Sequence, residues 1–111
     1  MHLDLRINDV DLMDALRVYV DRRLHFALSR FGDRVGLVTV RVFGVRSSRS
    51  IGMTCRVSAE FKPFGTVVVE DTDVDLYSAV DRATGRIGHL FGRRLKRARD
   101  MRLGRETVRA A

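Results

Sequence analysis

Four segments of the chain carry the residue patterns of β-strands. In the first, Leu3, Leu5 and Ile7 are separated by polar residues, which is the period of two expected of a half-buried strand. The same alternation recurs in residues 51–61, while residues 35–45 are rich in the β-branched residues that strands favour. Turn residues separate these runs. The predicted strands are residues 3–7, 35–45, 51–61 and 66–70.

Two further segments space their apolar residues by three and four positions, which predicts amphipathic helices. The first extends from Asp11, a predicted N-cap with Asp14 as its capping carboxylate, to a glycine stop at Gly32. The second covers about residues 74–100 and follows an acidic cluster, which favours a helix start through the macrodipole. No histidine lies nearby, so we interpret the cluster as a helix start rather than a metal site. It comprises Asp71, Asp73 and Asp75.

The predicted order of elements, β-α-β-β-β-α, indicates an α+β fold. A strand, a crossover helix and a returning strand form a parallel pair, whereas the short later connections form antiparallel neighbours. We therefore expect a four-stranded mixed sheet with two helices on one face and the other face open to water. We expect one domain, residues 1–101, followed by a basic, frayed tail at residues 102–111.

The positive charge of the chain is concentrated towards its carboxyl end. The 111 residues carry a formal net charge of +7. Residues 82–111 contain 10 Lys and Arg against 2 Asp and Glu, whereas the two signs nearly balance before residue 82. Concentrated positive charge attracts polyanions such as RNA, DNA or anionic lipid. A basic helix that only keeps the protein soluble is the alternative interpretation.

Five cationic or ionisable residues of the second predicted helix fall on one face, away from its apolar stripe. Like charges at this spacing repel each other, and a polyanion lying along them relieves the repulsion. Arginine also favours bidentate contacts to phosphates and stacking on bases. The pattern therefore predicts an RNA-binding line. Its members are Arg82, Arg86, His89, Arg93 and Arg97.

Gly85, Gly88 and Gly92 form a second line on the same helix. Each glycine costs about 1 kcal/mol relative to alanine in a helix interior, so the line calls for a physical reason. Small residues permit a close approach, either of the first helix or of an external group such as an RNA backbone. The sequence leaves both explanations open.

Signals of other functions are missing from the sequence. No segment approaches the roughly 20 apolar residues of a membrane span, and the first residues lack the pattern of a secretory signal. Cys55 is expected to be a core residue rather than a nucleophile. His2, His25 and His89 fall on different elements and predict no metal site. We expect a cytoplasmic protein with no enzymatic activity, cofactor, membrane partner or small-molecule substrate.

Two segments resemble a known family. They are Asp-Leu-Met-Asp-Ala-Leu-Arg-Val-Tyr-Val at 11–20 and Glu-Asp-Thr-Asp-Val-Asp-Leu-Tyr-Ser-Ala-Val-Asp at 70–81. With the element order, they resemble the ribosome hibernation-promoting factors, also called ribosome-associated inhibitor A, protein Y or sigma-factor modulation proteins. The resemblance covers about residues 2–100. It implies binding to the small ribosomal subunit between head and body, where messenger RNA and transfer-RNA anticodons would lie, and silencing of translation in starved cells.

The resemblance also implies that basic residues on both helices contact small-subunit rRNA. Carried over by position, Arg23 on the first helix matches this pattern. On the second helix the matching residues are Arg86, His89, Arg93 and Arg97. With the cationic residues beside them, the expected RNA-binding residues are Arg22, Arg23, Arg82, Arg86, His89, Arg93, Arg94 and Arg97.

The chain departs from the family pattern in several places. Phe26, predicted to point outward, stands where a lysine would be expected. Residues 43–46 replace the usual glutamate-lysine strand ending, and the glycine line is also unusual. The sequence lacks the C-terminal domain with which long members dimerise ribosomes, which implies a short form or a diverged paralogue. The alternative function is therefore a paralogue of the same fold that binds another RNA or a protein. A homo-oligomer is not required.

Overall fold

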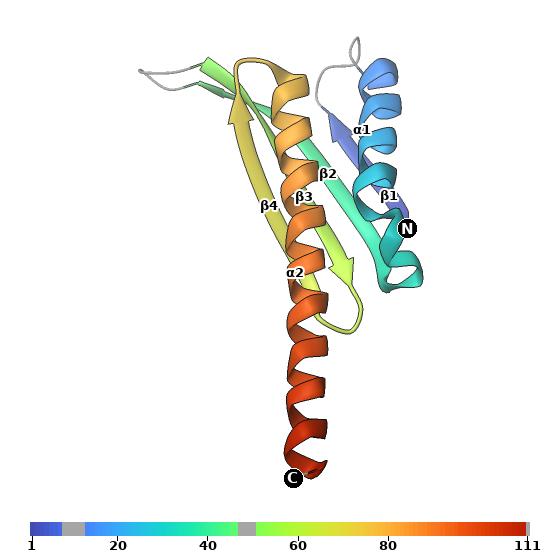
Figure 1. Cartoon of the computed structure of the whole chain (residues 1–111). Coiled ribbons are helices and arrows are strands. Elements are labelled where there is room, and N and C mark those ends of the chain that lie inside the picture. Colours follow the sequence, from blue (N-terminus) through green and yellow to red (C-terminus); the bar gives the residue numbers. More distant parts are fainter. Residues whose placement is uncertain (8–12, 47–50, 111) are drawn as a thin grey trace.

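The computed structural model describes the backbone of residues 1–7, 13–46 and 51–110 and the side chains of residues 1–6, 14–45 and 51–102. The described ranges contain four strands and two α-helices in the predicted order β-α-β-β-β-α (Figure 1). The elements are β1 (His2–Ile7), α1 (Met13–Leu28), a 3-10 helix η2 (Ser29–Arg34), β2 (Val35–Arg46), β3 (Ile51–Phe61), β4 (Gly65–Asp73) and α2 (Leu76–Ala110).

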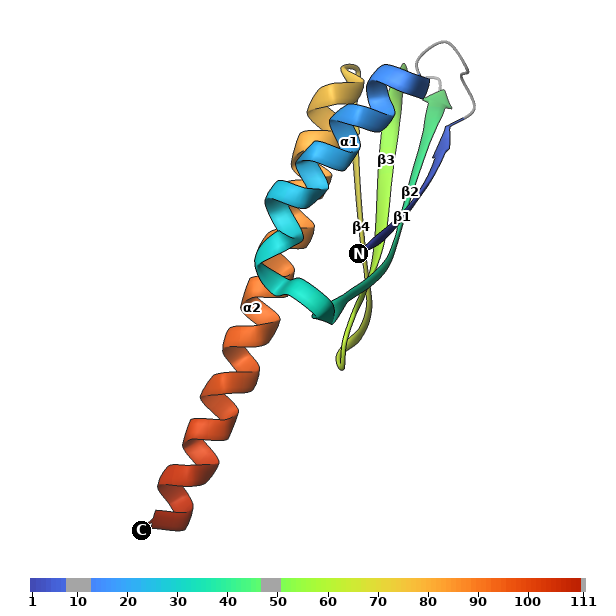
Figure 2. The same cartoon turned by 90° about the vertical axis from the view of Figure 1, so that its right-hand side faces the viewer.

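The four strands form one mixed sheet with the spatial order β1-β2-β3-β4. β1 pairs with β2 in parallel, because α1 crosses over between them, whereas β2–β3 and β3–β4 are antiparallel. Both helices lie on the same face of the sheet, and no described helix or strand covers the opposite face (Figure 2). The predicted fold class, including the two helices on one face, is confirmed.

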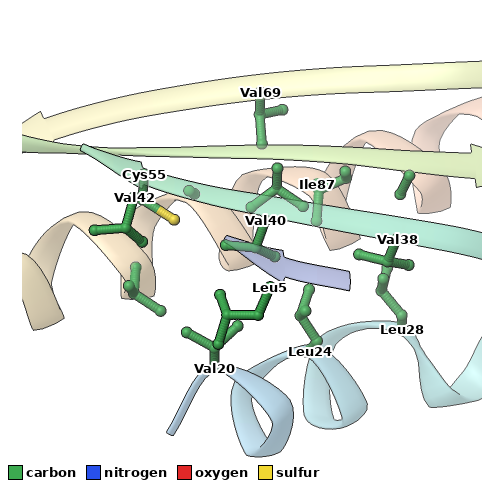
Figure 3. Close-up of a cluster of buried hydrophobic side chains, with 14 of the residues drawn as sticks. Leu5, Val20, Leu24, Leu28, Val38, Val40, Val42, Cys55, Val69 and Ile87 are labelled. Atoms are coloured by element: carbon green, nitrogen blue, oxygen red, sulfur yellow. The ribbon is translucent and has the colours of Figure 1, made fainter. Parts of the chain in front are cut away.

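The core lies between this sheet face and the two helices. Leu5 of β1 and Val40 of β2 lie beside Leu24 of α1 and Ile87 of α2, and all four side chains are buried (Figure 3). Where β3 ends, at Phe61, the core is aromatic. The rings of Phe61 and Phe91 stack with centroids 4.1 Å apart, and Phe31 packs edge-on against both. This packing holds α2 at a fixed position on the sheet.

Cys55 belongs to the same core, as predicted. Its side chain is buried on β3, and burial raises the pKa of its thiol to about 12. A thiol of this kind stays protonated at neutral pH and is a poor nucleophile.

The ends of several elements differ from the prediction. β4 continues to Asp73 instead of ending at residue 70, so Asp71 and Asp73 are strand residues. Asp75 alone starts the helix: its carboxylate accepts hydrogen bonds from the Tyr77 N–H at 3.2 Å and the Ser78 hydroxyl at 2.9 Å. α1 ends at Leu28, before η2.

Gly32 has a positive φ of 56°, which glycine accommodates, but its ψ of −130° is not that of a helix-stop glycine, and it lies within η2 rather than directly after α1. The predicted N-cap Asp11 lies outside the described residues. α2 continues to Ala110 instead of ending near residue 100, so its helical backbone includes most of the predicted tail. The division into residues 1–101 and 102–111 stays a prediction.

Candidate nucleic-acid interface

The cationic residues predicted from the sequence lie on the outer surfaces of the two helices. Seven of the eight side chains are exposed, and the eighth, Arg23, is intermediate. The apolar stripe of α2 faces the sheet, so the predicted line points away from the core. The exposed members are Arg22, Arg82, Arg86, His89, Arg93, Arg94 and Arg97.

Arg82 and Arg86, in the first half of α2, are tied to strand β4. The Nε of Arg82 donates to Asp71 at 3.1 Å, and one of its terminal nitrogens donates to Asp73. Arg86 donates to the Glu70 carbonyl at 2.9 Å and lies 3.9 Å from an Asp71 oxygen. These partners offset much of the positive charge at this end of the line.

The contacts of Asp73 shift its titration and that of Arg82. The Asp75 N–H and the Arg82 guanidinium, which both donate to Asp73, hold the pKa of that carboxyl below its usual value. The same ion pair raises the pKa of Arg82. Both shifts mark this cluster as an internal contact between α2 and β4.

Arg93, Arg94 and Arg97, in the second half of α2, lie beside an apolar part of β4. Together with Leu90 and Val67 they line a groove of about 170 Å³. In the part of the chain whose side chains are described, the ion pairs of α2 arginines are confined to Arg82 and Arg86. The second half therefore presents its positive charge to solvent.

Arg23 on α1 takes part in the contact between the helices. Its Nε lies 3.2 Å from Asp81 of α2, and the Tyr19 hydroxyl donates to the same carboxylate. This hydrogen bond and burial raise the pKa of Tyr19. Its ring packs edge-on against Tyr77, with centroids 4.7 Å apart. Arg23 is thus held between the helices, whereas Arg22 is exposed on the outer side of α1.

The glycine line of α2 divides into two kinds of position. A Cβ atom at Gly88 would lie 3.0 Å from the Ala27 carbonyl oxygen, and one at Gly92 would lie 2.9 Å from the Arg30 guanidinium. Close packing against the α1 backbone therefore accounts for Gly88, whereas a side chain at Gly92 would meet only the end of the Arg30 side chain, which can move aside. A Cβ atom at Gly85 would meet nothing within 4 Å, so helix packing does not explain Gly85.

A groove of about 330 Å³ runs between α1 and α2 beside Gly85. Phe26 stands at its edge with 81% of its surface exposed, which confirms the outward direction predicted for this side chain. The groove is lined by Arg23, Phe26, Ala27, Arg30, Thr84, Gly85 and Gly88.

A second, more basic groove was missed by sequence reasoning. Its volume is about 410 Å³, and it lies where η2, the β3–β4 turn and α2 meet. Tertiary packing brings its arginines together from segments that share no helical face, and Arg102 had been assigned to a frayed tail. Four arginines surround an apolar floor: Arg30, Arg34, Arg99 and Arg102 around Phe31, Pro63, Phe64, Leu95 and Ala98.

The open face of the sheet is weakly charged by comparison. Arg6, Arg41 and Arg56 are in register across three strands. Arg56 donates to Glu70 at 2.7 Å, and Arg6 pairs with Asp4 at 3.2 Å. These acidic partners reduce the attraction of this face for a polyanion.

The described residues provide no group of three or more side chains that could hold a metal ion. Among them, no helix has the combination of length and apolar character that crossing a membrane requires.

Comparisons with known proteins agree with this fold. Residues 3–101 match the family described as sigma 54 modulation protein / S30EA ribosomal protein. The chain is similar to the N-terminal domain of Thermus thermophilus Protein Y, with 27% identity and a TM-score of 0.66, over 84% of this chain and 98% of that one. It shares its fold with a ribosomal subunit interface protein from Coxiella burnetii, with 17% identity and a TM-score of 0.67, over 86% and 99%. A search of curated proteins gave no match.

Proposed function

The chain belongs to the sigma 54 modulation protein / S30EA ribosomal protein family, and from this premise we propose that it is a ribosome-binding translation inhibitor of the hibernation type. It docks on the small ribosomal subunit through the cationic surface of its helices. In that position it contacts rRNA and occupies the space that messenger RNA and transfer RNA need. It acts in the cytoplasm by binding alone, without a cofactor or a catalysed reaction.

The observation that carries this proposal is the positive charge of Arg93, Arg94 and Arg97, for which the residues with described side chains supply no ion-pair partner. Arg93, Arg94 and Arg97 share one stretch of helix whose neighbouring strand offers Val67 rather than a carboxylate. Guanidinium groups spaced by three and four residues along a helix suit successive phosphates of an RNA backbone. The basic groove that includes Arg99 and Arg102 adds further positive charge on the side of α2 that faces η2.

The eight predicted RNA-binding residues divide into two groups under this proposal. His89, Arg93, Arg94 and Arg97 contact rRNA directly, and Arg22 does so from α1. The other three arginines, Arg23, Arg82 and Arg86, have internal acidic or carbonyl partners, so they mainly fix the positions of the helices.

Co-sedimentation with small ribosomal subunits tests the proposal. The protein should pellet with the subunits at low salt and be released as salt rises, because arginine–phosphate contacts displace condensed counterions. In a cell-free system it should inhibit translation of a reporter messenger RNA without a leader and of one with a structured leader to the same extent. A protein that stays in the supernatant with excess subunits at low salt is not a ribosome-binding factor.

A second candidate function is a paralogue of this fold that binds another RNA or a protein. The exposed Phe26 favours it, because an apolar ring at a groove is a common feature of protein interfaces. Binding to purified subunits without other proteins separates the two candidates.

A further inference from the structure

The groove between α1 and α2 has a wall that suits a flat aromatic ligand. A single exposed apolar side chain is ordinary on a protein surface. Phe26, however, exposes 81% of its surface at the edge of a groove of about 330 Å³. A ring in this position is accessible to anything that enters the groove.

The charges around this ring suit an anionic ligand. The Arg23 guanidinium carbon lies 5.8 Å from the centre of the Phe26 ring, and Arg30 lines the groove one helical turn further along. Arg30 donates to the Gly88 carbonyl at 3.4 Å, which leaves other N–H groups of its guanidinium for a ligand. The Asp81 carboxylate pairs with Arg23, but it does not line the groove, and the described lining residues include no carboxylate, so Arg30 is the cation available to a ligand. Aromatic rings interleaved with arginines are the means by which proteins hold unstacked RNA bases.

Gly85 lines the α2 side of the groove and places no side chain in it. Since a Cβ atom there would meet nothing within 4 Å, protein packing permits a larger residue at this position. Alanine or leucine would also make a more stable helix. Gly85 is therefore a residue that lowers helix stability while keeping open the space opposite Phe26.

We propose that this groove binds one unstacked base of a single-stranded RNA segment. The base stacks on Phe26 above Gly85, and Arg30 contacts a flanking phosphate, while Arg23 stays paired with Asp81. This inference rests on the proposed function and specifies it: part of the rRNA contact is a single base that is not paired, in addition to the backbone contacts of α2.

Fluorescence gives a direct test, because the chain contains no tryptophan. The Phe26→Trp variant carries a single indole at the groove, and a base stacked on it should quench its emission. The Val18→Trp variant is the matched control, since Val18 is an exposed apolar residue of the same helix that does not line the groove. Both variants are titrated with purified small subunits and, separately, with a short unstructured RNA of mixed sequence.

Affinity measurements on three further variants separate a base from a protein partner. Phe26→Tyr should retain binding, whereas Phe26→Leu should lose on the order of tenfold, because leucine keeps the apolar surface but cannot stack. Gly85→Leu should raise the melting temperature and still weaken binding, since it strengthens the helix and fills the groove.

The outcomes are distinct. Quenching in the Phe26→Trp variant but not in the Val18→Trp variant supports the inference. Sedimentation of the Phe26→Trp variant with subunits without quenching overturns it and leaves the proposed function standing. If the wild-type protein does not sediment with subunits, the proposed function fails, and the oligonucleotide titration alone decides the inference. Full retention of affinity in Phe26→Leu would instead indicate an apolar protein contact and would also overturn it.

Discussion

The two halves of α2 carry arginines at the same spacing but in different surroundings. Arg82 and Arg86 lie beside the acidic end of β4 and bond to it. Arg93 and Arg97 lie four residues apart in the same way, yet the strand beside them presents Val67. The first half is thereby fastened to the sheet, and the second half presents its charge outward.

This difference shows that one sequence pattern can serve two purposes. Like charges four residues apart destabilise a helix unless something offsets them. In the first half, carboxylates of the same chain offset the repulsion. In the second half, the described part of the chain supplies no such partner, and an external polyanion would do so. The line of arginines is therefore not one uniform binding surface.

Charge reversal in the second half should have the largest effect on binding. The Arg93→Glu, Arg97→Glu double variant replaces two phosphate contacts by repulsion, and its affinity for small subunits should fall on the order of a hundredfold or more. The fold should survive, because both positions are exposed and glutamate is a good helix former. Sedimentation binding and circular dichroism measure the two quantities.

The matched control for this variant is Arg17→Glu with Arg41→Glu. It makes the same change in net charge at exposed positions on α1 and on the open sheet face. If both double variants lose equal affinity, total charge governs binding, and the second half of α2 is no special site.

The core beneath both halves can be tested through Cys55. The Cys55→Ser substitution places a hydroxyl in a fully buried position, so the free energy of unfolding should fall by about 1–3 kcal/mol. Affinity should change little once the folded fraction is matched. Urea denaturation measures the first quantity. Rapid labelling of the native thiol at neutral pH would contradict both its burial and its raised pKa.

The fold was predictable because its signals are local. The period of two around Leu5 and the alternation around Cys55 each identify a strand from neighbouring residues alone. The division of the arginine line was not predictable in this way. It depends on β4 extending to Asp73. The acidic residues at 71–75 are typical of a helix start, so the end of the strand could not be recognised from the sequence. Only Asp75 has that role.

The basic groove was also beyond sequence reasoning, for a different reason. Arg34 follows α1 and Arg99 lies in the second half of α2, and no periodicity relates them. They come together because Phe31 packs against Phe61 and Phe91 and so brings η2 beside α2. A contact between distant segments of this kind follows from tertiary packing, not from a pattern in one helix.

A substitution in the first half should affect stability more than binding. Arg82→Gln removes both ion pairs with β4, so the melting temperature should fall while the affinity for subunits stays within about twofold. Arg97→Gln should show the reverse: an unchanged melting temperature and weaker binding. Calorimetry and sedimentation on both variants make the comparison. A large loss of affinity in folded Arg82→Gln would show that the first half also contacts rRNA.

The salt dependence of binding distinguishes the halves more finely. Each phosphate contact that is lost should reduce the slope of log affinity against log salt by about one unit. Arg93→Ala should reduce the slope in this way, whereas Arg82→Ala should leave it unchanged. Equal slopes for the wild type and Arg93→Ala would mean that Arg93 does not neutralise a phosphate.

The smallest expected effect is the pH dependence of the contact between α2 and β4. The pKa of Asp73 is lower in the folded protein than the ordinary value of 3.8, first because the Asp75 N–H donates to it and then because of Arg82. A carboxyl of this kind stabilises the fold above its unfolded pKa, and this contribution is lost as the pH falls through the folded pKa. The wild type should therefore lose stability in acid more steeply than Asp73→Asn does.

Urea midpoints at about pH 7 and about pH 3 measure this difference. Asp73→Asn should be less stable than the wild type at the higher pH and closer to it at the lower pH. The control is Asp33→Asn, an exposed residue whose carboxylate forms no ion pair within the described residues. Equal acid sensitivity in the wild type and Asp73→Asn would show that Asp73 does not fasten the first half of α2. If Asp73→Asn loses the acid sensitivity of the wild type, the Asp73 carboxylate is one of the partners that distinguish Arg82 from Arg93. Its protonation in acid then leaves Arg82 with one acidic partner fewer.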